Sequence, residues 1–287
     1  MKKLLSLLLA LAMVLTMTAA FAEGAEEAEW GMAEFAAHAD IRYELANDYT
    51  GKTVILHSND VHGQVDGYAY IAGLRDYFKS LGAEVILADA GDFSQGTPYF
   101  SELDGVLEPR VINDLAYDCI TLGNHEFDND IEALTARLKA LRSETRVVCA
   151  NLDLSGFPLG EIVKPFAIIR RGGMKIGIIG LEADLSTNVT KAVSSRLTQL
   201  DNVEVTNRWA DYLHNEEKCD LIILLSHIGY EEDQALIPQT RWIDLVVGGH
   251  SHTFVDGFVY VADANGKQVP IITDGCWGLE MGQINVK

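Results

Sequence analysis

The sequence predicts a single layered α/β domain, on the strength of three observations. Beyond Thr50, short apolar runs alternate with segments of helical periodicity, as in domains whose helices cover a sheet. Several of the apolar runs end directly in polar, glycine-containing segments, which is typical of strands that lead into binding loops. No internal repeat and no Pro/Gly/Ser-rich linker divides residues 51–287. We therefore expect residues 51–287 to form one domain.

Residues 1–22 have the pattern of a cleavable secretory signal. Lys2 and Lys3 precede the apolar run Leu4–Leu15, and the segment ends in the small-residue motif Ala20-Phe21-Ala22. The run is shorter than the roughly 20 apolar residues of a membrane-spanning helix, and no cysteine follows the cleavage site as a lipid attachment point. We expect a secreted or extracytoplasmic protein, at the cell surface or in the periplasm, without a stable membrane anchor.

The chain is strongly acidic. It has 42 acidic and 22 basic residues, a formal net charge of -20. Residues 23–50, rich in alanine and acids, are expected to form a flexible leader without chemistry of its own. A broad basic surface for nucleic-acid phosphates is excluded, so we expect no nucleic-acid partner. An anionic substrate would need a metal cluster or a few local donors to hold it.

The expected strands are short apolar runs, spaced so that helices fit between most of them. They are Thr53–His57, Glu84–Ala88, Cys119–Leu122, Arg146–Ala150, Phe166–Arg170, Lys175–Ile179, Leu221–Leu225, Leu245–Val247 and Val269–Thr273. The step Arg171-Gly172-Gly173 predicts a hairpin.

The expected helices are Tyr68–Leu81, Pro109–Ala116 with proline at its first position, Ile131–Leu141, Asn207–Asn215 and a weaker one after Tyr230. The four cysteines are scattered and form no CxxC or zinc-type spacing. Cys119 and Cys149 lie in apolar runs, where a buried free thiol is the common state, but the sequence leaves disulfide pairing open.

Polar residues that can bind metal are concentrated directly after the strands. The segments are Ser58–Gly63, Asp89–Asp92, Gly123–Asp128, Ser226-His227 and Gly248–His252. In α/β sheets, ligands bind outside the carboxyl ends of strands, so these five loops can converge on one crevice. The sequence therefore predicts one site built from all of them.

The spacing and chemistry of these residues indicate a hydrolytic metal centre. Asp60 and His62, like His250 and His252, are two residues apart, so in extended chain both members of each pair would point to one side. Glycines flank the candidate ligands and allow sharp turns or close backbone approach. Carboxylate, imidazole and amide donors without thiolate suit Zn, Mn, Fe or a similar ion.

These blocks carry a family resemblance. Asp60-x-His62, Gly91-Asp92, Gly123-Asn124-His125-Glu126, His227 and Gly249-His250-x-His252 resemble the five-block signature of the binuclear metallophosphoesterases, also called calcineurin-like phosphoesterases. The four segments LHSNDVHG, AGDFSQGTP, TLGNHEFD and GGHSHT are similar in sequence to the catalytic domain of secreted 5'-nucleotidases. Purple acid phosphatases fit less well, because Asp92-Phe93-Ser94-Gln95 lacks the tyrosine that this family places there.

The resemblance implies two divalent metal ions and nine site residues. One ion would be held by Asp60, His62 and His252, the other by Asn124, His227 and His250, and Asp92 would bridge them. His125 and Asp128 would form the catalytic pair. The implied architecture is a four-layer α/β/β/α sandwich of two mixed sheets flanked by helices, with the metal site at one edge.

The implied activity is a secreted, metal-dependent phosphoesterase that hydrolyses phosphate esters, most of all nucleotides, by attack of a metal-bridging hydroxide. His125 would stabilise phosphoryl charge or protonate the leaving oxygen, and Asp128 would orient its imidazole. A cyclic-nucleotide or other phosphodiesterase on the same site is the alternative enzyme. A catalytically weak metal- or nucleotide-binding module is the alternative outside enzymes.

Some assignments have simpler alternatives. Asp128 could cap the helix that begins near Asp130. Glu126 and Asp89 are expected to orient loops rather than bind metal, and His57 to serve packing or the surface. Longer 5'-nucleotidases continue into a second, substrate-binding domain. The sequence resembles only their first domain, so we expect no such domain here and leave a separate partner that supplies it open.

Overall fold

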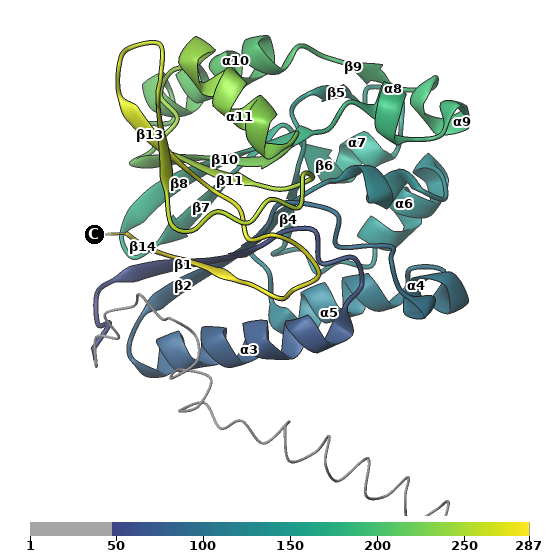
Figure 1. Cartoon of the computed structure of the whole chain (residues 1–287), viewed down its shortest axis with the longest axis horizontal. Helices are drawn as coiled ribbons and strands as arrows, with labels where there is room; N and C mark the ends of the chain where they lie inside the picture. The colour runs from purple at the N-terminus through teal and green to yellow at the C-terminus, as the bar shows by residue number, and fades with distance from the viewer. Residues whose placement is uncertain (1–47, 287) are drawn as a thin grey trace, which may run out of the picture. The chain divides into compact units, whose positions relative to one another are not determined.

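The computed structural model describes residues 48–286. The expected signal segment and nearly all of the expected leader lie outside the described residues. Two six-stranded sheets face each other, and helices cover the outer face of each. In Figure 1, α3 (Val65–Ser80) and α5 (Leu107–Leu115) lie below one sheet, while α10 (Asn202–Asn215) and α11 (Tyr230–Leu236) lie above the other. This is the expected four-layer sandwich.

The first sheet has the strand order β14-β1-β2-β3-β4-β6. Its strands are β14 (Gly282–Val286), β1 (Thr53–Ser58), β2 (Glu84–Asp89), β3 (Cys119–Thr121), β4 (Arg146–Val148) and β6 (Val163–Lys164). All neighbours are parallel except β14, which pairs antiparallel with β1. The carboxyl ends of β1, β2 and β3 therefore meet at one edge of this sheet.

The second sheet has the order β12-β13-β11-β10-β8-β7. Its strands are β12 (Val259–Ala262), β13 (Gln268–Ile272), β11 (Leu245–Gly248), β10 (Leu221–His227), β8 (Met174–Glu182) and β7 (Phe166–Arg171). The strands β8, β10, β11 and β13 are parallel, and β7 and β8 form the predicted hairpin through Gly172 and Gly173, both at positive φ. A further pair joins β5 (Leu152–Asp153) and β9 (Thr198–Gln199).

The remaining helices are short. They are α4 (Pro98–Leu103), α6 (Ile131–Leu138), α7 (Leu159–Ile162), α8 (Leu185–Asn188), α9 (Lys191–Ser194) and two 3₁₀ turns, η1 (Asn124–Phe127) and η2 (Ile237–Gln239). Their brevity explains why helical periodicity did not reveal α4, α7, α8 and α9.

Several helix boundaries differ from the expectation: α3 begins three residues earlier and α6 ends three residues earlier than expected, and the starts of α5 and α10 differ for local reasons. The prediction that Pro109 opens its helix is wrong, because α5 begins at Leu107 and Pro109 lies within the first turn. The missing N–H of proline is harmless there, since first-turn donors have no intrahelical partner. Helix α10 begins five residues before the expected Asn207, because the Asp201 side chain accepts a hydrogen bond from Glu204 N and caps it.

The main core lies between the two sheets, where Ile55, Ile86, Ile178, Ile223 and Val247 are buried together. The backbones of the two sheets approach each other closely at Gly180 of β8. A Cβ atom there would lie 2.3 Å from Val148 O of β4, and Ala150 N donates to Gly180 O at 2.8 Å. Glycine at this position therefore lets the sheets approach so that the loops after both can meet.

All four cysteines are free in the structure, and Cys119 and Cys149 are buried as expected. Within residues 48–286, no helix combines the length and apolar character needed to cross a membrane.

Candidate metal centre

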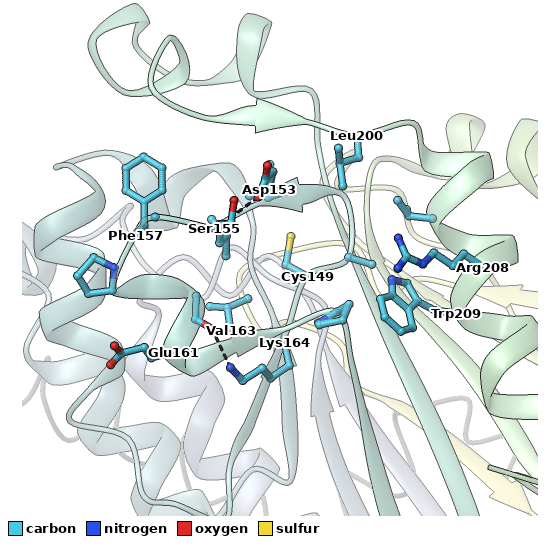
Figure 2. A pocket seen from close by; sticks show the side chains of 18 residues that line it. Cys149, Asp153, Ser155, Phe157, Glu161, Val163, Lys164, Leu200, Arg208 and Trp209 are labelled. Atoms are coloured by element: carbon cyan, nitrogen blue, oxygen red, sulfur yellow. Dashed lines mark hydrogen bonds between the residues drawn. The ribbon is translucent and has the colours of Figure 1, made fainter. Parts of the chain in front are cut away.

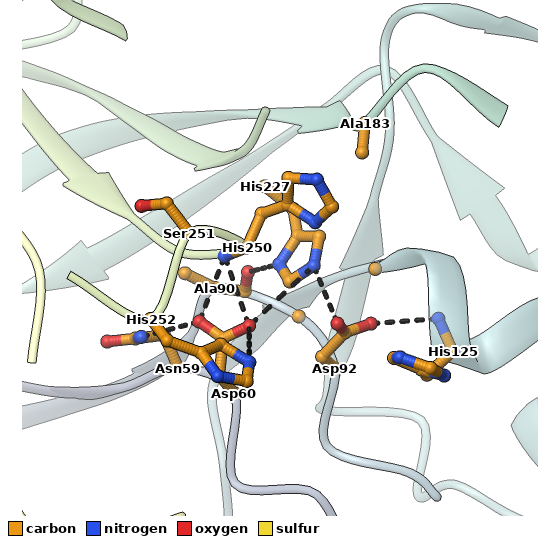
Figure 3. Close-up of polar contacts among 12 residues, drawn as sticks. Asn59, Asp60, Ala90, Asp92, His125, Ala183, His227, His250, Ser251 and His252 are labelled. Atoms are coloured by element: carbon orange, nitrogen blue, oxygen red, sulfur yellow. Dashed lines mark hydrogen bonds and ion pairs between the residues drawn. The ribbon is translucent and has the colours of Figure 1, made fainter. Parts of the chain in front are cut away.

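The five predicted loops converge on one crevice, at the carboxyl ends of β1, β2, β3, β10 and β11 (Figure 3). Three overlapping groups of side chains have ligand atoms within 4.8 Å of one another. The groups are Asp60–His62–His252, Asp92–His227–His250 and His62–Asp92–His125. Asp92 and His62 belong to two groups each, so the three groups form one continuous cluster.

Asp92 lies at the middle of this cluster. Its Oδ2 is 3.0 Å from His227 Nε2 and 3.9 Å from His62 Nε2, while its Oδ1 accepts a hydrogen bond from His125 N at 2.9 Å. Burial would raise the pKa of Asp92, but the imidazole of His227, helped by His125 and His62, holds that pKa well below its usual range. The carboxyl group is therefore a buried anion that faces both sides of the crevice.

Asp60 is fully buried on the other side of His227. Both of its carboxylate oxygens accept from His250 N, at 3.1 and 2.9 Å, and Asn59 Nδ2 donates to Oδ2 at 2.6 Å. Its Oδ1 lies 3.5 Å from His252 Nε2. These contacts fix the carboxylate in one orientation while leaving it close to imidazoles from the opposite sheet.

The ring nitrogens of the histidines are arranged as ligands. His227 Nδ1 donates to the carbonyl of Ala90 at 2.6 Å, which leaves Nε2 directed at the carboxylates of Asp92 and Asp60. Burial lowers the pKa of His227, but Asp92 and Asp60 outweigh it and raise that pKa well above its usual value. The two carboxylates therefore favour a positive charge at this position, which a proton or a metal ion can supply.

Two further donors support a cation at this place. His62 Nε2 lies 3.0 Å from His252 Nε2, and its other ring nitrogen, Nδ1, lies 3.2 Å from Gln95 O, so the tautomer that donates from Nδ1 leaves the lone pair of His62 Nε2 directed into the cluster. The amide oxygen of Asn124, in η1, is buried without a hydrogen-bond partner. A buried oxygen without a partner costs free energy that coordination of a cation would recover. The residues present therefore fit metal ions.

The backbone of the crevice is unusual. Five of the candidate ligands have left-handed φ values, with Asp60 at 49°, His62 at 50°, Asp92 at 54°, His250 at 76° and His252 at 53°. Such conformations cost about 1–3 kcal/mol each in non-glycine residues and cluster at functional sites. The expectation that each pair two residues apart lies in extended chain is wrong. The pairs converge because these tight left-handed turns fold the loops inward.

The flanking glycines are needed for close approach, as predicted. A Cβ atom at Gly123 would lie 2.3 Å from Asp92 Oδ1 and 2.7 Å from His227 Nε2. One at Gly91 would lie 2.7 Å from His227 Nδ1, and Gly91 itself has a φ of 92°. Any side chain at either position would displace the buried Asp92–His227 pair.

His125 and Asp128 form a hydrogen-bonded pair at the open side of the crevice. His125 Nδ1 lies 2.7 Å from Asp128 Oδ2, and both side chains are about one-third exposed. The hydrogen bond to Asp128 raises the pKa of His125 above its usual value, although burial opposes the shift. The interpretation of Asp128 as a helix cap is wrong, because Asp130 caps α6 by accepting from Ala133 N.

Glu126 and Asp89 act as loop supports, in line with the expectation. The carboxylate of Glu126 accepts from the backbone N–H groups of Asp92, Ser94 and Gly123, and burial, followed by the charge of Asp92, raises its pKa to about 8. Asp89 accepts from Ser58 Oγ and Gly91 N. Both carboxylates hold the loops from behind.

Sequence reasoning missed the support behind Asp60. His57 is fully buried and lies 2.8 Å from Asp274, and Asn59 bonds to both Asp60 and the segment around Asp274. The side-by-side order Asn59-Asp60 in the motif was the available signal, since a buried asparagine needs several partners.

A second hollow lies apart from the cluster (Figure 2). This cavity of about 780 Å³ is lined by residues from the segment 149–165, by Leu200 and by Val205, Arg208 and Trp209 of α10. None of the nine predicted site residues lines it. The predicted residues all lie at the crevice instead.

Comparison with known proteins agrees with this geometry. Residues 53–254 match the calcineurin-like phosphoesterase family. The chain is 32% identical over 266 residues to an apyrase from Tabanus yao, covering 81% of this chain and 47% of the relative. It is 32% identical over 264 residues to a snake venom 5'-nucleotidase from Gloydius brevicauda, covering 81% and 44%.

A solved structure gives the same result. The 5'-nucleotidase precursor from Thermus thermophilus superposes with a TM-score of 0.77 at 28% identity, covering 82% of this chain and 51% of that one. The chain thus spans about half the length of the curated relatives and of this solved structure. Because the family match covers most of the described residues and the fold agrees with it, the chain belongs to the calcineurin-like phosphoesterases, hydrolases that act on phosphoric esters.

Proposed function

We propose that the protein is an exported, metal-dependent phosphoesterase that hydrolyses nucleotides in the manner of a 5'-nucleotidase. The observation that carries this proposal is the position of Asp92, a buried carboxylate shared by two of the three candidate ligand groups. A phosphoryl group carries negative charge, and a protein with a formal charge of -20 needs local positive charge to hold it.

Two divalent ions would supply that charge. Asp60, His62 and His252 would hold one, Asn124, His227 and His250 the other, and Asp92 would contact both. The donor set of carboxylates, imidazoles and one amide oxygen favours zinc, manganese or a similar ion. When bound, such a pair lowers the pKa of coordinated water and neutralises phosphoryl oxygens.

Side chains of the protein itself would stabilise the phosphoryl group and protonate the leaving oxygen. Asp128 accepts from His125 Nδ1–H, so His125 Nε2 remains available at the open side of the crevice. There it can donate a proton to the leaving oxygen or stabilise charge on the phosphoryl group, and its raised pKa keeps it protonated closer to neutral pH. Asp128 holds the imidazole in the orientation that this task requires.

Nucleotide substrates and export rest on additional support. Relatives over 81% of the chain include 5'-nucleotidases from snake venom and from Mus musculus, as well as an apyrase. The residues Lys2 and Lys3 followed by Leu4–Leu15 have the charge and hydrophobicity of an export signal.

Phosphate release by the protein from AMP and from phenyl phosphate, with manganese, with zinc and with a chelator, tests the proposal. AMP turnover that needs metal and exceeds turnover of the aryl ester supports it. Release of p-nitrophenol from the diester bis(p-nitrophenyl) phosphate, without phosphate release from either monoester, would replace the nucleotidase by a phosphodiesterase. Absence of turnover with every metal, for a folded protein, would leave a binding module.

A further inference from the structure

The segment between β13 and β14, residues 273–281, passes directly beside the candidate ligand Asp60; we call it the strap. Asp274 N donates to Asn59 Oδ1 at 2.9 Å, and Asn59 Nδ2 donates to Gly275 O at 2.8 Å. Farther along, Trp277 N donates to the carbonyl of Asp60 at 2.7 Å. The strap is therefore tied to the backbone and side chains of the loop after β1 at three points.

The strap is also fixed by close packing on its other side. A Cβ atom at Gly67, in the first turn of α3, would lie 3.0 Å from Gly278 Cα, and one at Gly278 would lie 3.1 Å from Gly67 Cα. Gly278 has a φ of 66°. Backbone-to-backbone contact of this kind leaves little room for the strap to shift, so the residue before Gly278 is held in place.

That residue is Trp277, and its side chain is exposed rather than packed in the core. Its φ is 63°, in the left-handed region that bulky residues avoid, and 50% of it is exposed. The other two tryptophans in the described residues stack or pack on neighbouring rings, Trp242 on His214 at 3.8 Å and Trp209 on Phe166 at 5.0 Å. Trp277 instead meets His252 edge-on, with ring centroids 6.0 Å apart at 72°.

The exposure of the cluster shows where a bound ester must leave the crevice. The side chains of Asp60 and His227 are fully buried and that of Asp92 is 2% exposed, whereas those of His125 and His252 are 33% and 39% exposed. A phosphoryl group beside Asp92 can therefore extend its ester substituent only past the exposed rim. Trp277 lies at the His252 part of that rim.

We propose that Trp277 is a specificity-determining residue whose indole stacks against the planar ring in the leaving group of the phosphate ester, which is the base of a nucleoside or an aryl ring. This inference rests on the proposed function and names the substrate class of the same site. The face of an indole ring attracts planar aromatic rings, whichever base or substituents they carry. Because the strap fixes the backbone, little conformational freedom is lost when such a group binds.

The kinetic test compares leaving groups with and without a ring. Trp277→Ala should raise KM for AMP and phenyl phosphate roughly 5- to 20-fold, as expected for loss of one stacking contact, and change KM for glycerol 3-phosphate less than about 2-fold. Trp277→Phe should restore most of the loss. Tyr260→Ala, which removes an aromatic side chain 58% exposed on β12, is the matched control and should leave all three KM values unchanged.

A structural role for Trp277 predicts a different pattern. If the alanine variant disturbed Asp60 through the strap, kcat would fall equally for all three esters. Trp277→Phe would then affect ring and non-ring esters alike. That result, or equal KM changes for ring and non-ring esters, would overturn the proposal.

A binding measurement separates this inference from the proposed function. Adenosine has no phosphate to hydrolyse, and stacking on Trp277 should quench part of the selectively excited tryptophan emission of the protein in a saturable way. Trp277→Phe should abolish that quenching, while Tyr260→Ala should retain it. Quenching without turnover of any ester would refute the phosphoesterase and keep the stacking site. Quenching unchanged in Trp277→Phe, or absent in the unmodified protein, would refute the stacking site.

Discussion

The crevice that holds the candidate metal ligands and the cavity beside α10 are both concave, but residues of different chemical character line them. The crevice gathers buried carboxylates and imidazoles within a few ångströms of one another. The cavity is lined largely by apolar and glycine residues, its Lys164 bonds to Gly160 O, and its Arg208 lies over the ring of Trp209. No residue lining it carries a buried side-chain polar atom without a partner, within the part of the chain described.

Their backbones differ in the same way. Candidate ligands in the crevice have left-handed φ values, held by bonds such as Asp60 N to Gly91 O and His62 N to Asp92 O. Around the cavity only Gly156 has a positive φ, with open space about it. Buried charge and strained backbone, which cost stability, therefore distinguish the candidate functional site better than cavity volume does.

Substitution of one carboxylate in the crevice and one in the cavity should give the largest difference in phosphoesterase activity. Asp92→Asn removes the charge shared by two ligand groups and should lower phosphoesterase activity by more than about 10²-fold, with loss of bound metal. Asp153→Asn, in the cavity lining, should stay within about 2-fold of the unmodified protein. Steady-state kinetics with metal analysis checks both. Comparable losses in the two variants would remove the functional distinction between the hollows.

Glycine substitutions should repeat the contrast through sterics alone. Gly123→Ala places a Cβ atom 2.3 Å from Asp92 Oδ1, so it should displace the carboxylate and lower activity by about 10²-fold or more. Gly156→Ala meets open space, and its positive φ should cost about 1 kcal/mol of unfolding free energy without loss of activity. Denaturant titrations and kinetics on both variants measure this. An active Gly123→Ala variant would show that the observed approach is not required.

The pair at the open side of the crevice should show a smaller, graded effect. His125→Gln should lower kcat by about 10²-fold, and Asp128→Asn, which leaves the imidazole in place, by about 10-fold. Asp130→Ala removes the cap of α6 and should cost about 1 kcal/mol of stability while kcat stays unchanged. If Asp130→Ala reduced kcat as much as Asp128→Asn, the loss would reflect helix stability rather than proton transfer.

Behind the crevice, a buried carboxyl group should make stability depend on pH. Burial raises the pKa of Asp233 to about 7, although Ser226 Oγ donates to it. The folded state therefore keeps a proton that the unfolded state loses near pH 4, so this group lowers stability progressively as pH rises from about 4 to 7. The total cost is of the order of a few kcal/mol.

Asp233→Asn should flatten that slope and unfold less readily than the unmodified protein at pH 8. Urea titrations of both proteins between pH 5 and pH 8 measure the difference. Asp153→Asn, at an exposed position, is the control and should keep the original slope. An unchanged slope in Asp233→Asn would mean that Asp233 is already ionised in the folded protein.

Much of the fold and the site could be predicted because strand ends can be recognised in the sequence. A buried apolar run such as Thr53–Ser58 followed at once by Asn59, Asp60 and His62 has few interpretations other than a binding loop. The edge strands β12 and β14 and the two-residue strands β5, β6 and β9 were not predicted, because edge strands bury fewer of their residues and two residues carry no periodicity. The left-handed turns were also not predicted, because they depend on contacts between loops that are distant in the sequence.

The support behind Asp60 was missed for a related reason. The partners of Asn59 are Asp274 and Gly275, far along the chain, and only the fold brings them together. Similarly, nothing local distinguishes Trp277 from a core aromatic residue. Its exposure and its place beside His252 depend on the fold.

The antiparallel pairing of β14 with β1 has a consequence for biosynthesis. The ribosome releases β1 early, but its outer neighbour emerges only after every other strand of both sheets. Until then β1 presents a free edge, and Asp60 at its end lacks the strap that fixes it, so the nascent protein is exposed to wrong strand pairing. We therefore expect the candidate metal centre to form late, with metal capture following the emergence of β14 rather than guiding the folding of the sheets.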